Sequence, residues 1–261
     1  MLLEKLKMEY TLNKEERRIY DKIEKTNYML PVIKGIKSIV KEYGDNKTAW
    51  KEVFSHLYKI LKGAENDVRN LLSERKLKGE IKDINQSLKS IAGNAFSNAI
   101  VYIFLTNKIL GNIRSNIFIT GQKSKIKNFD KIATINVDGE TQKPDADLII
   151  YTKKENNELD KCIILSLKTS LRERAGQTYK WKLLMEIATS DNSIKDKYNI
   201  SYDVDDMPMV CFATVNFYNE IDNPQHRGMF KFFDKAFISK PVKKDFISPL
   251  SELVDFVNKE L

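Results

Sequence analysis

The sequence predicts an α/β (α+β) fold, in which helices flank a mixed β-sheet and a helical N-terminal region comes first. Three observations support this prediction. Apolar residues recur at three- and four-residue spacing through the first third of the 261 residues, as they do along amphipathic helices. Beyond Gly111 the chain changes to short apolar runs separated by polar loops, which is typical of strands. A further helical segment precedes the last of these runs, an order found where helices cover a sheet.

The expected N-terminal helices cover residues 14–27, 29–43, 49–62 and 87–110. Pro31 suits the first turn of the second helix, where its missing N–H is not needed. Gly44 and Gly63 favour helix ends, because glycine readily adopts the left-handed conformation of a C-cap. The fourth helix is expected to be interrupted only at the Ala92-Gly93 step.

The expected strands cover residues 117–119, 134–137, 147–151, 162–167 and 209–215. Asp138-Gly139 is a turn signal after the second of them. The polar residues 153–158 predict a hairpin loop that joins the third and fourth strands. A helix from Leu171 to Ala188 should precede the last strand.

Composition excludes several classes of protein. With 42% hydrophobic residues the chain can bury a core, so a disordered chain is not expected. No run approaches the about 18 uninterrupted apolar residues of a membrane span. The N-terminus alternates charged and apolar residues without the core of a signal peptide. We therefore expect a cytoplasmic protein with no membrane partner.

The few cysteines and histidines exclude other chemistries. Cys162 and Cys211 lie in apolar surroundings and are expected to be buried free thiols. Neither cysteine belongs to a CxxC pair, and His56 and His226 are the only histidines, so no cluster of four zinc ligands appears. Two histidines also make a serine or cysteine triad hard to build. The net charge of +8 favours a polyanionic partner, although a lysine-rich composition alone produces such an excess.

The informative constellation lies where two expected strands meet. Asp145 and Asp147 are two residues apart at the start of one strand, so both side chains face the same way. Ser166 and Lys168 repeat that spacing at the end of the next strand. If these strands pair as an antiparallel hairpin, the aspartates and the lysine converge at one end of the sheet. Carboxylates there can hold Mg²⁺, and the ammonium group can lower the pKa of an attacking water and stabilise a phosphate transition state.

These residues resemble the signature of a known nuclease superfamily. Pro144-Asp145 with Asp147, followed by Ser166-Leu167-Lys168, is similar to the PD-(D/E)XK motif, with serine at the variable acid. The stretch from Lys168 to Gln177 is similar to a K-T-(S/T)-x-(K/R)-(D/E)-R-x-x-Q pattern of type II restriction endonucleases. Residues 90–96 resemble the A-G-x-A-(F/L)-E helix start of such enzymes, except that Ser97 replaces the glutamate. The resemblance covers about residues 87–215, roughly half of the chain.

The resemblance implies a restriction-endonuclease-like fold and a Mg²⁺-dependent enzyme that cuts double-stranded DNA at a short palindromic site, with GGNCC as one target type. A two-fold symmetric site implies a homodimer. Residues 86–261 would form the catalytic domain, and residues 1–85 a helical region for dimerisation or DNA clamping. Two alternatives stay open: a structure-specific repair or recombination nuclease on the same fold, and a non-catalytic DNA-binding protein.

The resemblance also implies roles for individual residues. The expected catalytic residues are Asp147, Lys168, Ser166, Asp145 and Glu173, and the expected metal ligands are Asp147, Asp145 and Glu173. Glu173 is preferred to Glu186 as the missing acid because it follows Lys168 more closely, although both glutamates can equally be solvated helix residues. Asp145 and Asp147 can also be read as turn residues, and Lys168 as an exposed strand end.

Seven side chains are candidates for DNA contact. Arginine and glutamine can bind guanine and adenine edges bidentately, but a solvated surface or a phosphate contact is the simpler interpretation of each. One group lies on the helix after Lys168, and the other at a polar loop near residue 226. The candidates are Arg172, Arg174, Gln177, Lys180, Gln225, His226 and Arg227.

Overall fold

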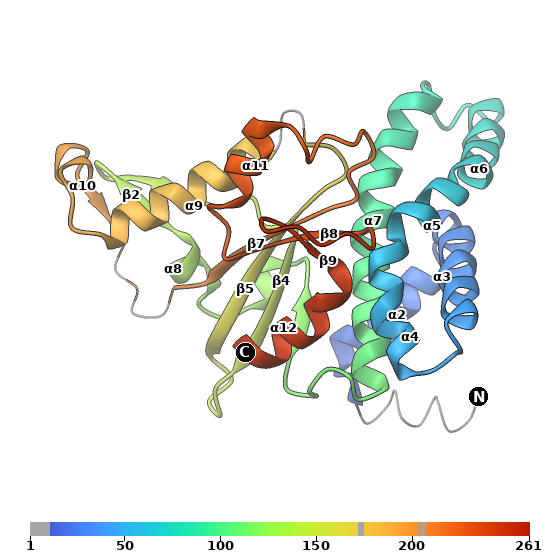
Figure 1. The fold of residues 1–261 in the computed structure, drawn as a ribbon, viewed down its shortest axis with the longest axis horizontal. Coiled ribbons are helices and arrows are strands. Elements are labelled where there is room, and N and C mark those ends of the chain that lie inside the picture. Colours follow the sequence, from blue (N-terminus) through green and yellow to red (C-terminus); the bar gives the residue numbers. More distant parts are fainter. Residues whose placement is uncertain (1–10, 172–174, 203, 205–206) are drawn as a thin grey trace. The chain divides into compact units, whose positions relative to one another are not determined.

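The computed structural model describes residues 11–171, 175–202, 204 and 207–261, which fold into two compact units (Figure 1). The first unit contains residues 11–117, 238–243 and 249–260. The second unit contains the described residues between 118 and 237 and residues 244–248. A functional boundary at residue 85 stays a prediction, because compactness does not by itself assign function.

The first unit is helical, as the spacing of its apolar residues predicts. Its elements are α2 (Lys14–Glu24), η1 (Asn27–Met29), α3 (Leu30–Glu42), α4 (Lys47–Glu52), η2 (Val53–His56), α5 (Leu57–Gly63), α6 (Glu65–Leu77), α7 (Ile84–Ile109), η4 (Leu250–Glu252) and α12 (Leu253–Glu260). Pro31 lies in the first turn of α3, and Gly44 follows its end at a φ of 93°. The sequence analysis missed α6.

The expected helix over residues 49–62 is wrong in one respect, since it is divided into α4, the 3-10 turn η2 and α5. The reason is a set of contacts with distant residues. The N–H of Tyr58 donates to the carbonyl of Ser239 at 3.2 Å, and the Ser55 hydroxyl accepts from the N–H of Ser251 at 3.0 Å. The expected interruption at Gly93 is also wrong, because α7 runs through it without a break.

Helix α7 is the core helix of the first unit. By length and composition it is the one helix among the described residues that could cross a membrane, and half of its most apolar window is buried inside the protein. It packs against α2, α4, α5 and α6, and it carries Asn107 and Lys108 at buried positions. A core helix can pass this test of length and composition without crossing a membrane.

The second unit is built on two sheets and the helices beside them. The larger sheet has six strands in the order β1-β4-β5-β7-β8-β9, and the smaller has three in the order β3-β2-β6. The strands are β1 (Phe118–Thr120), β2 (Ile135–Val137), β3 (Glu140–Gln142), β4 (Leu148–Lys153), β5 (Leu159–Lys168), β6 (Ile200–Ser201), β7 (Met209–Thr214), β8 (Lys235–Ile238) and β9 (Ser248–Pro249). The helices are η3 (Lys123–Lys125), α8 (Phe129–Ala133), α9 (Ala175–Thr189), α10 (Ser193–Lys197) and α11 (Pro224–Phe230).

The expected hairpin is confirmed at the centre of the larger sheet. Strands β4 and β5 are antiparallel, with Leu148 opposite Leu165, and Asn157 adopts a positive φ in the loop between them. On its other side β5 pairs in parallel with β7, from Ile163 beside Met209 to Lys168 beside Thr214. The sheet is therefore mixed, as predicted, and β5 is one of its interior strands.

Helix α9 leads from the larger sheet to the smaller one, where it contacts β2 and β6 (Figure 1). The turn expected at Asp138-Gly139 is confirmed, since both residues have positive φ and join β2 to β3. A positive φ at two central residues is the requirement of a tight hairpin turn, which explains the Asp-Gly pair. The smaller sheet itself was not predicted.

Both cysteines are buried free thiols, as expected. Burial raises the pKa of the Cys162 thiol to about 12 and also raises the pKa of the Cys211 thiol. Since the thiolate is the nucleophilic form, these groups are unreactive in the folded protein.

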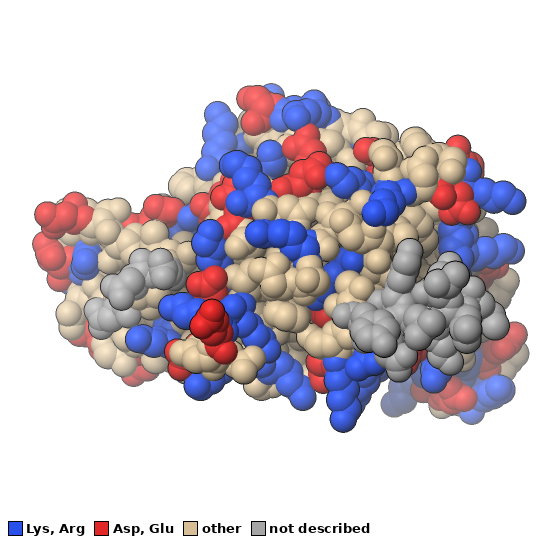
Figure 2. Space-filling model, turned by 90° about the horizontal axis from the view of Figure 1, so that it is seen from below, with Lys and Arg blue, Asp and Glu red and all other residues tan. Residues whose placement is uncertain are grey.

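Charged groups of both signs are interspersed over the face of the molecule in Figure 2, with lysine and arginine beside aspartate and glutamate. The sequence has 44 basic and 36 acidic residues, and among the described residues on that face the basic ones do not form one continuous surface. Net charge alone does not locate a polyanion-binding surface there.

A buried ion pair lies in the helical unit. The Lys108 ammonium donates to both carboxylate oxygens of Glu16, at 2.8 and 2.9 Å, and the two side chains are 0% and 2% exposed. Burial lowers the pKa of Lys108, although the neighbouring Glu16 acts in the opposite direction. Glu16 also accepts from the N–H of Asn13 and so completes the capping box that begins α2.

We expect Glu16→Ala to lower the free energy of unfolding by about 3–5 kcal/mol, because it leaves the Lys108 ammonium buried without a counter-charge. Urea unfolding followed by circular dichroism measures this loss. Asp21→Ala, at an exposed position of the same helix, is the control and should change stability by less than about 0.5 kcal/mol. Equal stability of the two variants would contradict the prediction.

Candidate active site

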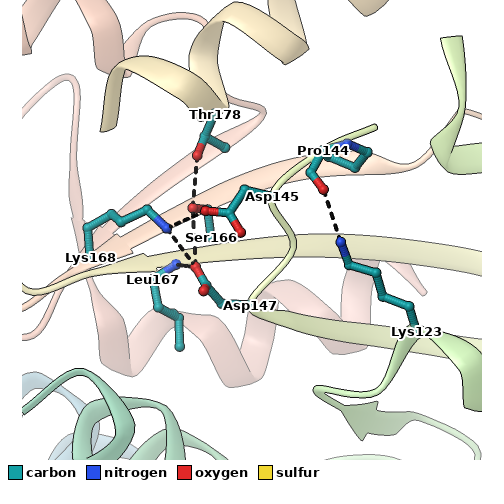
Figure 3. A network of polar contacts seen from close by, with 8 residues as sticks. All are labelled: Lys123, Pro144, Asp145, Asp147, Ser166, Leu167, Lys168 and Thr178. Carbon is teal, nitrogen blue, oxygen red and sulfur yellow. Dashed lines mark hydrogen bonds and ion pairs between the residues drawn. The ribbon is translucent and has the colours of Figure 1, made fainter. Parts of the chain in front are cut away.

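The two aspartates lie just before β4, where the sequence analysis placed them. Pro144 is buried, and its carbonyl accepts a hydrogen bond from the Lys123 ammonium at 3.0 Å (Figure 3). A Cβ atom at Gly121 would lie 3.3 Å from the carbonyl oxygen of Asp147, so a small residue is needed where these backbones approach. The sequence analysis did not anticipate that Gly121 and Lys123 support the aspartates.

Lys168 joins the two aspartates, as the hairpin predicted. Its ammonium lies 3.0 Å from Asp145 Oδ2 and 2.9 Å from Asp147 Oδ2 (Figure 3). The lysine side chain is only 7% exposed, whereas the aspartate side chains are 50% and 32% exposed. A buried ammonium is costly unless it is paired, and here two carboxylates at the rim of the sheet provide the pairing. This geometry does not support reading Lys168 as an exposed strand end.

One oxygen of Asp147 receives three donors. In addition to Lys168, Asp147 Oδ2 accepts from the N–H of Leu167 at 2.7 Å and from the Ser166 hydroxyl at 3.5 Å. No hydrogen bond joins Asp147 Oδ1 to another of the described residues, and the same holds for Asp145 Oδ1. The carboxylate of Asp147 is therefore fixed through one oxygen and can offer the other to a ligand.

Ser166 is fully buried, and its hydroxyl is also 3.0 Å from that of Thr178 in α9 (Figure 3). Because Ser166 donates to Asp147, Thr178 is the donor of this second bond. The serine hydroxyl thus has partners on both sides, which favours a role in holding Asp147 over direct contact with a metal ion. Sequence reasoning missed Thr178, whose only signal is its place directly after Gln177.

The carboxylates fit a hard divalent cation of the Mg²⁺ type. Such an ion takes oxygen ligands, commonly one or two carboxylates, and fills its other positions with water and substrate phosphate. Asp145 and Asp147 can supply two such oxygens. Within the described part of the chain, no group of three or more His, Cys, Asp or Glu residues has a metal-binding arrangement. The expected third ligand, Glu173, lies outside the described residues.

Glu186 has another partner in the structure. Its carboxylate lies 2.6 Å from the ammonium of Lys182, which also donates to Asp234 at 3.1 Å. Burial alone would lower the pKa of Lys182, but the hydrogen bonds and charges of Glu186 and Asp234 outweigh it, so the pKa is raised. This cluster connects α9 to the residue before β8. The choice of Glu173 over Glu186 stays a prediction.

The candidates for DNA contact are only partly described. Gln177 and Lys180 are exposed on α9, whereas Arg172 and Arg174 lie outside the described residues. The expectation of a loop at Gln225, His226 and Arg227 is wrong, because these residues form the first turns of α11. Asn223 caps this helix by accepting from the N–H of Gln225, and Pro224 occupies its first turn. Asn-Pro is a helix-start signal that the sequence analysis read as a loop.

The chain is similar to known restriction enzymes over about half of its length. Residues 124–256, about half of the chain, match the family model described as BsaWI restriction endonuclease type 2. A protein of Methanocaldococcus jannaschii, MjaVIP, is 31% identical over 155 residues, and its name assigns it provisionally to the type II restriction enzymes. That match covers 54% of this chain and 66% of the relative, slightly less than two thirds of its length. The chain belongs to the BsaWI family of type 2 restriction endonucleases, which confirms the resemblance found in its sequence.

Proposed function

We propose that this protein is a Mg²⁺-dependent type II restriction endonuclease that hydrolyses phosphodiester bonds of double-stranded DNA at a short specific sequence. The observation that carries the proposal is the buried Lys168 ammonium shared by Asp145 and Asp147 at the rim of the sheet. Family membership supports it independently, and nucleases of this family use a divalent metal ion. Mg²⁺ is the ion that best fits two carboxylates and a phosphate substrate.

In the proposed chemistry the metal ion and the side chains of the protein have different roles. The bound ion would activate a water molecule and neutralise charge on the scissile phosphate. Asp147 would hold the ion through the oxygen that Leu167 and Lys168 leave open, and the more exposed Asp145 would supply a second carboxylate. Lys168 stabilises the negative charge that develops on the phosphate, because a fixed ammonium in a partly buried site needs little rearrangement. For the third carboxylate we propose Glu173.

The proposed DNA-binding groups include side chains of two helices. Gln177 and Lys180 on α9, with Arg172 and Arg174 earlier in the sequence, would meet phosphates and base edges, as would Gln225, His226 and Arg227 on α11. A palindromic target and a homodimer follow from the two-fold symmetry expected of type II sites. The GGNCC target type stays a prediction, as do the cytoplasmic location and a dimerisation or clamping role for residues 1–85.

Plasmid cleavage in Mg²⁺ tests the proposed function. The wild-type protein should produce discrete fragments, and sequencing their ends gives the target. Asp147→Ala should abolish cleavage, because it removes the carboxylate that would hold the metal, while DNA binding measured without Mg²⁺ persists. A smear would indicate a nonspecific nuclease, and intact plasmid a binding protein. Near-normal cleavage by Asp147→Ala would contradict the assignment of the site.

Lys168→Ala should lower the single-turnover rate on pre-bound DNA by at least about 10²-fold, the scale of one lost electrostatic stabiliser. Lys168→Arg should also cleave poorly, because a planar guanidinium does not replace a compact ammonium in so buried a position. DNA affinity should fall little, since one phosphate contact among several is a small part of binding. Lys154→Ala, at an exposed position of the loop between β4 and β5, is the matched control for losing a lysine and should keep a normal rate. An unchanged rate for Lys168→Ala would exclude its catalytic role.

Thr178→Val should raise the Mg²⁺ concentration needed for half-maximal cleavage by about 10-fold, within the range found when a residue behind a metal ligand is lost. The valine has nearly the same shape but cannot donate to Ser166, so Asp147 is held less firmly. Thr178→Ser keeps the hydroxyl and should restore the wild-type Mg²⁺ dependence. If Thr178→Val and wild type require the same Mg²⁺ concentration, Thr178 only fills space.

A further inference from the structure

Glu220, in the loop between β7 and α11, holds the segment that follows the catalytic strand. Its Oε2 atom accepts a hydrogen bond from the N–H of Leu171 at 2.8 Å and another from the Ser170 hydroxyl at 3.3 Å. Leu171 is 1% exposed, so its side chain is anchored as well. Nothing in the sequence pattern around Lys168 identifies this distant carboxylate.

Backbone hydrogen bonds also join the same loop to the segment that follows the catalytic strand. The N–H of Val215 donates to the carbonyl of Lys168 at 3.4 Å, and the N–H of Phe217 donates to the carbonyl of Thr169 at 3.2 Å. These bonds continue the parallel pairing of β5 and β7 beyond the ends of both strands. The position of the segment after Lys168 therefore depends on the conformation of the loop that contains Glu220.

The other side of Glu220 faces α11. Its N–H donates to the side chain of Asn216 at 2.7 Å, and its carbonyl oxygen lies 2.8 Å from His226 Nδ1. Because a carbonyl only accepts, Nδ1 carries the proton of this bond, which leaves Nε2 as the second polar atom of the ring. Asn216 and Asn219 have φ values of 52° and 54°, a left-handed conformation that asparagine tolerates well.

Beside this loop is an open hollow of about 440 Å³. Its lining consists of Tyr218, Asn219, Glu220, Asn223, Gln225 and His226. Side-chain amides, an imidazole and a phenol can donate to and accept from the edges of base pairs. The hollow thus offers several hydrogen-bonding groups that are connected, through Glu220, to the segment after Lys168.

We infer that Glu220 is a positioning residue that couples contact of a DNA groove at the α11 hollow to the placement of the segment after Lys168. Contact with the correct bases fixes α11 and His226, which fixes the main chain of Glu220. The side chain of Glu220 in turn fixes Ser170 and Leu171, the first residues on the path to α9. This inference rests on the proposed function, and it adds a link between recognition and cleavage.

The test compares single-turnover cleavage of the mapped target with cleavage of a duplex that differs by one base pair. Glu220→Ala should cleave the target about 10- to 10²-fold more slowly at saturating enzyme, the scale of a small misplacement of reacting groups. The loss should be smaller on the altered duplex, where the link is not engaged, so the discrimination ratio falls. Glu220→Gln, which keeps an oxygen for the N–H of Leu171, should have an intermediate rate.

Asp222→Ala is the matched control. Asp222 is an exposed carboxylate of the same loop that pairs with Lys244, so its loss should leave the rate and the ratio unchanged. If Glu220→Ala fails to fold, Ser170→Ala removes one donor to the same carboxylate and should lower the ratio in the same direction.

Three results would overturn the inference: an unchanged rate for Glu220→Ala, equal losses on both duplexes, or a loss that disappears at saturating enzyme. Equal losses would indicate a purely structural role, and recovery at saturation a binding role. An inactive wild type would overturn the proposed function and the inference together. An active wild type with an unaffected Glu220→Ala variant overturns the inference alone.

Discussion

The arrangement at the rim of the sheet depends on one atom, Asp147 Oδ2, which accepts hydrogen bonds from Leu167, Lys168 and Ser166. A carboxylate held by a main-chain N–H and an ammonium cannot rotate freely, and its second oxygen keeps a defined direction. The same contacts allow Lys168 to be almost fully buried, because its charge is compensated where it leaves the strand. Asp147 and Lys168 therefore position one another.

Position 166 has a serine where the PD-(D/E)XK motif has an acid, so the site differs from that motif in charge as well as in shape. The side chain there is fully buried, and a carboxylate at that depth would have to be desolvated beside two other carboxylates. A hydroxyl avoids this repulsion and is satisfied by Thr178 and Asp147. The consequence is that Asp145, Asp147 and Lys168 together carry a single net negative charge. A divalent ion would then depend on the DNA phosphate, and on a further acid such as Glu173, for the rest of its compensation.

The features that the sequence predicted are those with a local signal. Apolar runs with a polar loop between them indicated the β4–β5 hairpin, and the two-residue spacing of its polar residues fixed which side chains would meet. Thr178 and Glu220 carry no such signal, because each acts on residues far along the chain. The division of residues 49–62 has the same origin. The Tyr58 N–H, which would donate within a regular helix, donates instead to the carbonyl of Ser239, and the Ser55 hydroxyl accepts from Ser251. In each of these cases a hydrogen bond between residues distant in the sequence determines a feature that the local pattern does not show.

The position of β5 makes the surroundings of Lys168 rigid. This strand is hydrogen-bonded to β4 on one side and to β7 on the other. Lys168, at its end, therefore belongs to one of the most constrained parts of the sheet. Five of the side chains proposed to contact DNA lie instead on α9 and α11, whose exposed faces can vary without disturbing the cluster around Asp147. If those faces had no connection to the residues around Lys168, contact at the faces would have no effect on that cluster. The hydrogen bonds that Leu171 and His226 donate to Glu220 form a continuous path between α11 and the segment next to Lys168.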